Sequence, residues 1–416
     1  MTTASGIEKK LILAPQSTQG TCAIAALATA QYLRRLTSNL SMTKETYQSN
    51  EINANRQVSD FRHGVQSIEG TLSGELSPGT YYRLMAAILR KDFAAGNNSG
   101  AEADVTAAST GGATGTFTSA ATATFITAKL KVGDVIRWTG FAGDGAANNS
   151  RNFLITELTE LIMTGTMLDG SPVVADIAGD TVTATVVGKK SWTPATAHSE
   201  NWFSIEHNFS DIDLSEVFWD LKCNSMAVKL PASGLATIDF GMMGLNHTNY
   251  AAGNAPYFTS VLAASTSGVL AAVNGALYVA GTKIALLTGL DFDVAGNLSS
   301  EGVVGSNVKP DIFDGRVVVK GNMSLFFENA TFRDYFENET EVSVNCVFTD
   351  DNSATADFLA FSMPRVKVGG ASKDDGEKGI VQTMPFTALF NTGGDDGVTC
   401  TVNTLATTLS IQDSTL

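Results

Sequence analysis

Apolar and polar side chains alternate regularly along residues 66–76. Ile68 and Leu72 fall on one face of this pattern, whereas Glu69 falls on the other. A period of two is typical of a β-strand with one buried and one solvated face. The sequence therefore predicts a long strand here, with a polar side left open to water.

Helical spacing replaces this alternation from residue 81 onward, because apolar side chains recur at positions 81, 84, 85, 88 and 89. Ser77 and Pro78 precede them and have the residue types of a helix N-cap and first helical position. The pattern predicts an amphipathic helix that packs on a sheet.

The strand and helix pattern occurs twice. "VKGNMSLFFENATFRDYFENE", from Val319, aligns with "IEGTLSGELSPGTYYRLM", from Ile68, at an offset of 251. The same offset pairs Gly70 with Gly321. Upstream it pairs Asp60 with Asp311 and Gly64 with Gly315. Farther along, "SMAVKL" resembles "SMPRVKV" at an offset of 137, so the first copy carries about 114 extra residues. We expect two related β domains, one of which bears an insertion.

The extra length lies after the first helix. Residues 96–115 are of low complexity and predict a flexible stretch. Short β-like runs separated by Gly, Asp and Asn turns follow, at Thr124–Ile126, Val135–Trp138, Phe153–Thr156, Leu161–Thr164 and Val182–Val187. They predict a small inserted β domain.

The resulting fold class is mainly β with short flanking helices, made of two repeated domains and a small inserted β domain. Asn274-Gly275 predicts a hairpin turn between the copies, and residues 380–391 and 398–411 predict C-terminal strands. The expected parts are an N-terminal arm (1–30), a first domain (31–95 and 193–246), an insertion (96–192), a connection (247–282) and a second domain (283–416).

Charge and cysteine content narrow the possible functions. The formal net charge is −15 and Lys/Arg runs are short, which disfavours tight binding to phosphate backbones. Four cysteines stand far apart without CxxC spacing, so they predict isolated thiols rather than a zinc site or disulfide framework. The first residues show no signal-peptide pattern, which predicts a soluble protein made in the cytoplasm without a membrane partner.

Candidates for catalysis are weak. Asp60, Arg62 and His63 form a possible acid/base group, but the second copy has Phe313 and Asp314 in place of the last two. The other histidines lack partners at metal-ligand spacing, and the acidic turns near residues 374 and 393 lack a calcium-loop ligand pattern. The sequence predicts no enzyme, no cofactor and no metal site.

The stretch "SNEINANRQVSDFRHGVQSIEGTLSGELSPGTYYRLMAAILRKDF" resembles the signature region of bacteriophage tail tube proteins from phages with long, flexible, non-contractile tails. "GLDFDVAGN", "FFENATFRDYFENET", "SMPRVKVGGASK" and "QTMPFTALFN" are similar to the C-terminal portion of that family. The resemblance covers most of the chain outside the insertion and the first 30 residues.

This resemblance implies a structural virion protein without enzymatic activity. It implies β-sandwich-like domains with a flanking helix, arranged six to a ring, in rings that stack into the tail tube. Two domains per chain then predict a ring of three copies of the chain with pseudo-sixfold symmetry. Other implied partners are the tape measure, tail terminator and distal tail proteins, and double-stranded DNA in transit without specific binding.

The polar faces of the two long strands are the candidate lining of such a tube. We expect a hydrophilic, net acidic lumen that repels passing DNA, although Lys320 and Phe326 weaken that expectation. The predicted lumen-lining residues are Ser67, Glu69, Thr71, Ser73, Glu75, Lys320, Asn322 and Ser324.

Three alternatives stay open. A porin would share the alternating strands but needs a signal peptide and aromatic girdles. A capsid or baseplate component would share the structural character. An enzyme on a β scaffold would be marked by paired carboxylates.

Overall fold

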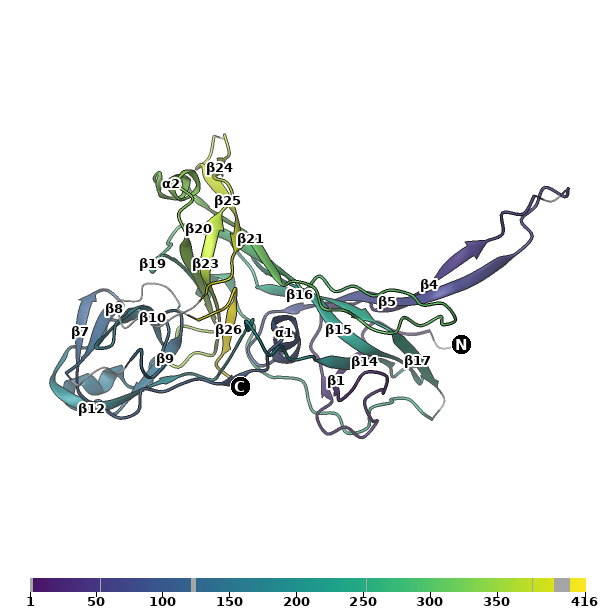
Figure 1. Ribbon diagram of the computed structural model, residues 1–416. Helices are drawn as coiled ribbons and strands as arrows, with labels where there is room; N and C mark the ends of the chain where they lie inside the picture. Colours follow the sequence, from purple (N-terminus) through teal and green to yellow (C-terminus); the bar gives the residue numbers. More distant parts are fainter. Residues whose placement is uncertain (1–2, 53, 121–124, 252, 376, 393–404) are drawn as a thin grey trace.

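The structure is a computed structural model that describes residues 3–52, 54–120, 125–251, 253–375, 377–392 and 405–416. Within them, one large antiparallel sheet and one closed barrel contain nearly all the regular structure. Figure 1 shows the barrel at one end, the sheet in the centre and a long hairpin projecting at the other end. The predicted mainly β fold with few, short helices is confirmed.

The first half of the sheet forms what we call the first unit. Its strands pair in the order β1, β14, β15, β16, β5 and β4, and β17 pairs with the first part of β15. Short β3 also pairs with β5, and β2 with β1. The bounds are β1 Lys9–Gln16, β2 Gln31–Tyr32, β3 Thr37–Ser38, β4 Ser41–Gln48, β5 Phe61–Glu75, β14 Trp202–Phe209, β15 Leu214–Leu230, β16 Thr237–Gly244 and β17 Asn246–Ala251.

The second half, called the second unit, repeats this pairing order with later strands. The order is β18, β22, β23, β25, β21 and β20, and β26 pairs with the first part of β23. Short β19 and β24 pair with β18 and β25. The bounds are β18 Gly275–Val279, β19 Thr282–Lys283, β20 Leu287–Ala295, β21 Val318–Phe326, β22 Val342–Thr349, β23 Phe358–Val368, β24 Ser372–Lys373, β25 Val381–Ala388 and β26 Ser410–Asp413.

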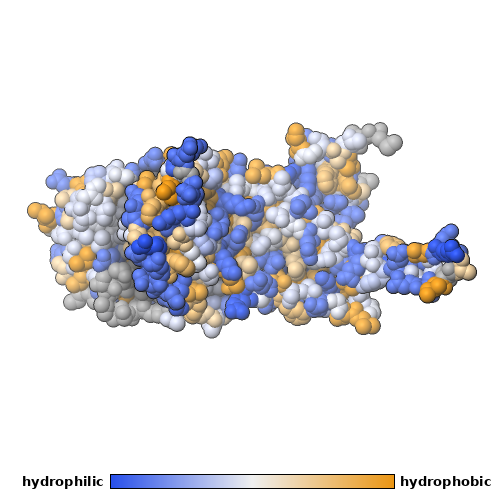
Figure 2. All heavy atoms as spheres, turned by 90° about the horizontal axis from the view of Figure 1, so that it is seen from above, coloured by the Kyte–Doolittle hydropathy of each residue, from blue (hydrophilic) through white to orange (hydrophobic). Residues whose placement is uncertain are grey.

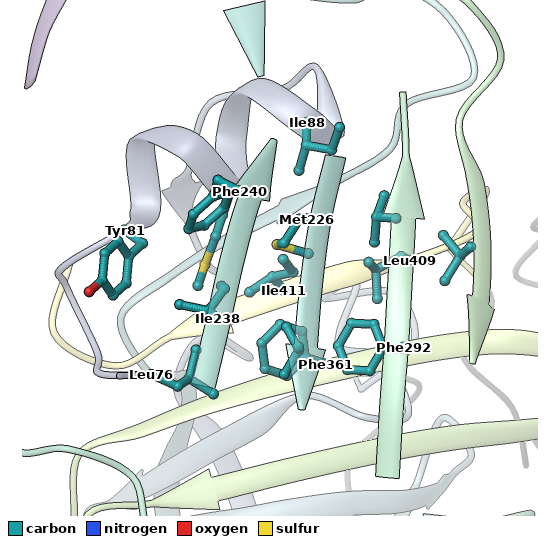
Figure 3. Packing of buried hydrophobic residues seen from close by; sticks show 14 of the residues in the cluster. Leu76, Tyr81, Ile88, Met226, Ile238, Phe240, Phe292, Phe361, Leu409 and Ile411 are labelled. Carbon is teal, nitrogen blue, oxygen red and sulfur yellow. The ribbon is translucent and has the colours of Figure 1, made fainter. Parts of the chain in front are cut away.

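The two units are joined edge to edge, because the second part of β15 pairs with β20 from Ser225 opposite Ala295 to Leu230 opposite Leu290. Their buried side chains also form one cluster, in which Met226 and Phe240 lie with Phe292 and Phe361. Figure 3 shows these residues under α1 and across the neighbouring strands. The two units therefore share one core.

Strand registers correct the downstream part of the sequence repeat. Cross-strand neighbours run Glu69, Met243, Lys222 in the first unit and Lys320, Thr387, Lys367 in the second. These positions keep the 251-residue offset in β5 and β21, but they relate β15 to β23 by 145 residues. The offset of 137 is therefore wrong, because a match of six letters along alternating strands can be satisfied at several registers.

The N-terminal segment is part of the sheet. Leu11, Ile12 and Leu13 are buried in β1, which pairs along its whole length with β14. Residues 9–16 are thus a strand of the first unit rather than a separate arm.

Both units carry a short helix after their long polar strand, α1 (Tyr82–Leu89) and α2 (Thr331–Glu337). The predicted N-cap at Ser77 and first helical residue at Pro78 are wrong, because Gly79 has a left-handed backbone with φ of +67° and donates its N–H to Asp413. A left-handed residue cannot continue a right-handed helix, so α1 begins three residues after Gly79, at Tyr82.

The barrel consists of six strands in the order β10, β11, β8, β7, β12 and β9. Aromatic side chains fill it, including Phe117 and Trp138 with ring centres 4.7 Å apart. The bounds are β7 Glu102–Gly111, β8 Thr114–Ser119, β9 Val135–Thr139, β10 Phe153–Leu158, β11 Ile162–Met167 and β12 Asp176–Val186, with a 3-10 helix η1 at Gly143–Asn148.

Four predicted runs match barrel strands, and two further strands were missed. β7 and the start of β8 lie in the stretch predicted to be flexible. The two strands form a hairpin, because Gly111 and Gly112 both have positive φ and Val105 and Phe117 are buried. Small Thr, Ala and Ser residues hid that pattern. The predicted run at Thr124–Ile126 lies partly outside the described residues, and residues 125–126 form a turn.

The barrel is fixed to the second unit. Its stem strands β6 (Ala94–Ala95) and β13 (Lys189–Trp192) pair with each other, and β13 pairs with β26. Gln412 of β26 accepts from Val135 N–H at 2.9 Å and donates to the Val135 and Val187 carbonyls at 2.8 Å. Barrel and sheet therefore form a continuous structure.

The connection between the units turns at a different place than predicted. Asn274 ends a 3-10 helix η2 (Ala272–Asn274), and Gly275 has φ of −83° and begins β18. The hairpin turns instead at Ala280 and Gly281, whose φ values are +49° and +77°. Two consecutive positive φ values are what a tight hairpin turn needs.

The remaining predictions concern the cysteines, the C-terminal strands and membranes. The cysteines in the described residues, Cys22, Cys223 and Cys346, are free. β25 lies within the predicted 380–391 strand, and β26 ends the region predicted at 398–411, of which 398–404 fall outside the described residues. In the described parts of the chain, no helix combines the length and hydropathy needed to cross a membrane.

Candidate functional site

The first unit opens one face of β5 to water. Ile68 and Leu72 are buried, as the alternation predicts. The intervening side chains are half-buried or exposed on the opposite face, namely Ser67, Glu69, Thr71, Ser73 and Glu75. The structure therefore places the five predicted residues of the first copy together on one open face.

This face continues onto β16. Asp239 lies opposite Ser73 and Thr237 lies opposite Glu75 in the register of the two strands. Burial alternates strictly along β16, with Ile238 and Phe240 buried between more open neighbours. The same period of two thus aligns the polar sides of both strands.

Strands from the joint between the units extend the face. Lys229 of β15 lies opposite both Thr237 and Asp291, and its Nζ is 3.6 Å from an Asp239 oxygen. Asn322 of β21 donates to Asp291 at 3.1 Å. Polar side chains therefore run from the first unit into the second without a break at the joint.

The predicted residues of the second copy lie on the same face. Lys320 and Asn322 are exposed and Ser324 is half-buried on β21, where they follow the pattern of β5. Lys320 is opposite Asp293 of β20. We define the polar face by its open polar residues: Ser67, Glu69, Thr71, Ser73, Glu75, Lys229, Thr237, Asp239, Asp291, Asp293, Lys320, Asn322 and Ser324.

Five carboxylates and two ammonium groups stand on the polar face so defined. The carboxylates belong to Glu69, Glu75, Asp239, Asp291 and Asp293. Lys229 reduces the local negative charge by its contact with Asp239, and Phe326 adds an exposed apolar ring at one end. The polar face is therefore net acidic.

Sequence reasoning missed the acidic residues of β16 and β20. Their signal was present, because Asp291 and Asp293 alternate with Leu290, Phe292 and Val294. The prediction followed only the strand before each helix, and nothing in one sequence states which other strands lie beside it.

Two repeated glycines allow the strands to lie close together. A Cβ on Gly70 would meet the backbone of Leu40, and one on Gly321 would meet the carbonyl oxygen of Asp291. Because backbone atoms cannot swing aside as a side chain can, both positions require glycine. The aligned pair therefore has a shared packing reason.

The weak catalytic candidates lie outside this face. Asp60 and Arg62 form an exposed ion pair of 2.9 Å, and the ring of His63 packs edge-on against Phe61 at 5.2 Å. All four belong to the projecting hairpin. Solvated groups without a cleft around them provide no water-excluded place for chemistry.

His207 is a structural group. It is buried in β14 and its Nε2 lies 2.7 Å from the hydroxyl of Ser38. Burial, with Lys9, Arg35 and His247 nearby, lowers the pKa of His207 to about 3, so the ring is neutral at neutral pH. A neutral, enclosed imidazole of this kind stabilises the first unit.

The described residues contain no group of three or more His, Cys, Asp or Glu side chains arranged to hold a metal ion. Asp374, in the first of the two acidic turns, accepts from the N–H of Val381 at 2.6 Å. Residue 376 and the turn at 393–397 lie outside the described residues.

Comparison with known proteins adds to this geometry. No curated protein matches the chain. A family model described as phage tail tube protein matches residues 6–388, which include the first unit, the barrel and the second unit as far as β25. The chain belongs to the phage tail tube protein family, whose members are non-enzymatic structural proteins that polymerise into the tube of the virion tail.

Proposed function

We propose that three copies of this chain close into a ring of six units, that rings stack into the tail tube, and that the polar face lines the passage for DNA. The observation that carries this proposal is the repeated pairing order of the two units and their edge-to-edge joint. The units are two copies of one module, and residues 96–192 are an insertion in the first copy.

The pairing of strands at the joint inside the chain indicates which segments would pair at the joint between chains. Within the chain, the second part of β15 pairs with β20 of the following unit. The counterparts of these two segments are residues 370–375 and residues 38–43. In the described structure these segments pair only toward the inside of their own units, through β24, β3 and β4.

The two ends of the chain are therefore complementary. Residues 370–375 of one chain pair antiparallel with residues 38–43 of the next, and Ser372 lies opposite Ser41 as Ala227 lies opposite Asp293. Unpaired strand edges expose N–H and C=O groups, and closing a ring removes them. Repeating one joint geometry around an axis produces a closed ring rather than an irregular aggregate.

The polar face then becomes the inner surface. Its strands, β5, β16, β15, β20 and β21, follow one another in the sheet across the joint inside the chain, between the two segments that form the joint between chains. A ring of many strands has a lumen wide enough for water. Net acidic walls repel DNA phosphates, so DNA passes without being held.

The barrel lies outside the passage in this arrangement. Its apolar contacts with the sheet use β18, β22 and β23, where Tyr278, Val347 and Phe358 are buried with Val135 and Leu154 of the barrel. None of these five residues is among those that define the polar face. Contacts with the tape measure, tail terminator and distal tail proteins belong to the same proposal.

A disulfide across the proposed joint tests the proposal. Ser41→Cys and Ser372→Cys, in a chain with Cys22→Ser and Cys400→Ser, form a cross-strand pair close enough for a disulfide. Mild oxidation of the assembled protein should give products that end at three linked chains. Thr43→Cys with Ser372→Cys is the matched control, because it is displaced by one cross-strand step.

Two results contradict the proposal. One is a chain that stays single at high concentration and in tail preparations. The other is assembled protein in which the control pair links as efficiently as the designed pair, or in which the ladder of products continues past three chains.

A further inference from the structure

We propose that the projecting hairpin of each chain docks on the second unit of the neighbouring chain in the same ring. The hairpin, here called the arm, comprises residues 45–52 and 54–63. This inference rests on the proposed ring and names the partner surface that the arm contacts, which is a second copy of this chain.

The arm has more exposed apolar surface than a solvated hairpin needs. It projects well beyond the sheet, and Figure 2 shows hydrophobic as well as hydrophilic atoms on it. Tyr47, Val58 and Phe61 are each more than half exposed, and Ile52 is fully exposed. Clustered exposed apolar side chains mark interaction surfaces.

The second unit contains the counterpart of the arm, a loop at residues 296–317 between β20 and β21. Its sequence "SSEGVVGSNVKPDIFDG" is similar to "SNEINANRQVSDFRHG" of the arm. The offset of 251 pairs Tyr47 with Leu298 and Phe61 with Ile312. Between them a shift of one residue, to an offset of 250, pairs Ile52 with Gly302 and Val58 with Val308.

This counterpart loop is already docked on the first unit. Ile312 is buried with Trp202 and Leu245, and Leu298, Val308 and Met243 pack against them. Leu298, Val308 and Ile312 are the counterparts of Tyr47, Val58 and Phe61, three of the four apolar residues that the arm exposes. These apolar positions are therefore packed against the sheet in the loop of the second unit and exposed to solvent in the arm of the first unit.

Polar contacts hold the loop in place. Lys222 donates to the carbonyl of Ile312 at 3.0 Å, and its Nζ lies 4.5 Å from the ring centre of Trp202. The N–H of Gln66 donates to Asn307 at 2.8 Å. The loop thus joins the sheet by its backbone as well as by its side chains.

The register of the units locates the receiving surface for the arm. Lys367, Thr387 and Leu389 are the counterparts of Lys222, Met243 and Leu245. Leu389 is half-buried and Phe390 beside it is 45% exposed. An apolar surface therefore lies where the arm would bring Phe61.

Charges around this surface fit the arm. Glu341 takes the place of Trp202 and is held by Arg365 at 2.7 Å, while Lys367 is 3.4 Å from Glu339. Glu339 is mostly exposed. The arm carries Arg62, whose side chain is 80% exposed, at the position of Phe313.

The geometry of the joint indicates that the arm contacts a neighbouring chain in the same ring. The loop at 296–317 reaches the unit whose β15 pairs with its own β20. The arm follows β4, the counterpart of β20, and so reaches the unit that pairs with β4 in the proposed ring. A partner in the next ring would not repeat this relation.

Cross-linking distinguishes the two partners. Phe61→Cys with Leu389→Cys, in the chain with Cys22→Ser and Cys400→Ser, should link chains efficiently and give no product larger than three chains. Ile52→Cys with Leu389→Cys is the matched control, because Ile52 aligns with Gly302 and has no docked counterpart. We expect about tenfold less product from this control.

A second measurement does not depend on new thiols. Phe61→Ser and Val58→Ser should each raise the protein concentration needed for ring assembly about tenfold, because each removes an apolar contact. Ile52→Ser should leave that concentration unchanged. Circular dichroism of the unassembled chain checks that folding is intact.

Each outcome decides between the proposals. Rings that form with the Ser41 and Ser372 disulfide but without the Phe61 and Leu389 disulfide overturn the arm inference alone. Products longer than three chains from the arm pair place the arm on another ring and overturn it as well. Failure to form rings at all overturns both proposals.

Discussion

The two units share a pairing order but differ in how fully their helices are buried. α1 buries Leu84, Met85, Ala86, Ile88 and Leu89, whereas in α2 only Phe332 is buried. Phe336, the counterpart of Met85, is 43% exposed. The same topology therefore supports a tightly packed helix in one unit and a loosely packed helix in the other.

Extra segments explain this difference. In the first unit, α1 contacts the stem strand β13, and Leu270 of the connection donates its N–H to Leu76 and is fully buried. Beside α2, a cavity of about 260 Å³ lies next to Phe332 and Tyr335. The first unit is completed by segments of its own chain, whereas the second has an open cavity beside its helix.

The largest expected difference between the two units concerns the buried side-chain amide of Gln382. Gln382 of β25 is fully buried, borders the cavity, and its side-chain amide has no hydrogen-bond partner among the described residues. Its counterpart in the first unit is Ile238, also fully buried. Ile238→Gln should lower the free energy of unfolding by about 4 kcal/mol, because it buries an amide without partners.

The reverse substitution serves as the control. Gln382→Ile should raise the free energy of unfolding of the unassembled chain by about 1 kcal/mol, because it removes an unsatisfied polar group. Chemical denaturation of both variants measures the two changes. A loss of stability in Gln382→Ile would show that the amide has a partner in solution.

The helices give a second matched pair. Met85→Ala should lower the free energy of unfolding by about 3 kcal/mol, because the side chain is enclosed and leaves a cavity. Phe336→Ala should change it by less than about 0.5 kcal/mol, because the ring is largely in solvent. Equal losses in thermal or chemical denaturation would mean that the two helices are packed alike.

Acid should affect the units differently. His207 has Cys346 as its counterpart, and burial lowers the pKa of His207 to about 3 from an ordinary value near 6.5. Between these values the unfolded chain binds the extra proton, so this contribution to stability is complete above pH 6.5 and is lost as the pH falls toward 3.

The expected size is about 2 kcal/mol between pH 7 and pH 5. His207→Gln should remove that part of the pH dependence, whereas Cys346→Ala should preserve it. Denaturation of the three proteins at several pH values measures it. An unchanged pH profile for His207→Gln would assign the dependence to other groups.

Local patterns in the sequence predicted the local structure well. The alternation along residues 66–76 gave the buried and open sides of β5, because each side chain must point to one face or the other. Backbone freedom at single residues defeated other predictions. Gly79 delays α1, and Ala280 with Gly281, rather than Asn274 with Gly275, forms the hairpin turn.

The polar face was predicted in part, because alternation along a single strand shows which of its side chains share a face. The eight predicted residues lie on the polar face, and their lining of a tube stays a prediction. Asp239, Asp291 and Asp293 were missed because they join the face only through the pairing of β16 with β5 and of β20 with β21. Pairing partners far apart in sequence leave no local signal.

The sequence by itself determined the β class, the repeated strand and helix, the alternation that makes a polar side, and the family resemblance. Only the tertiary structure decided that the two copies share one core, that β15 joins β20, and that one loop is docked while its counterpart projects. The reason is physical. A side chain's direction follows from its neighbours in the chain, but an edge or an apolar residue finds its partner through contacts between distant segments.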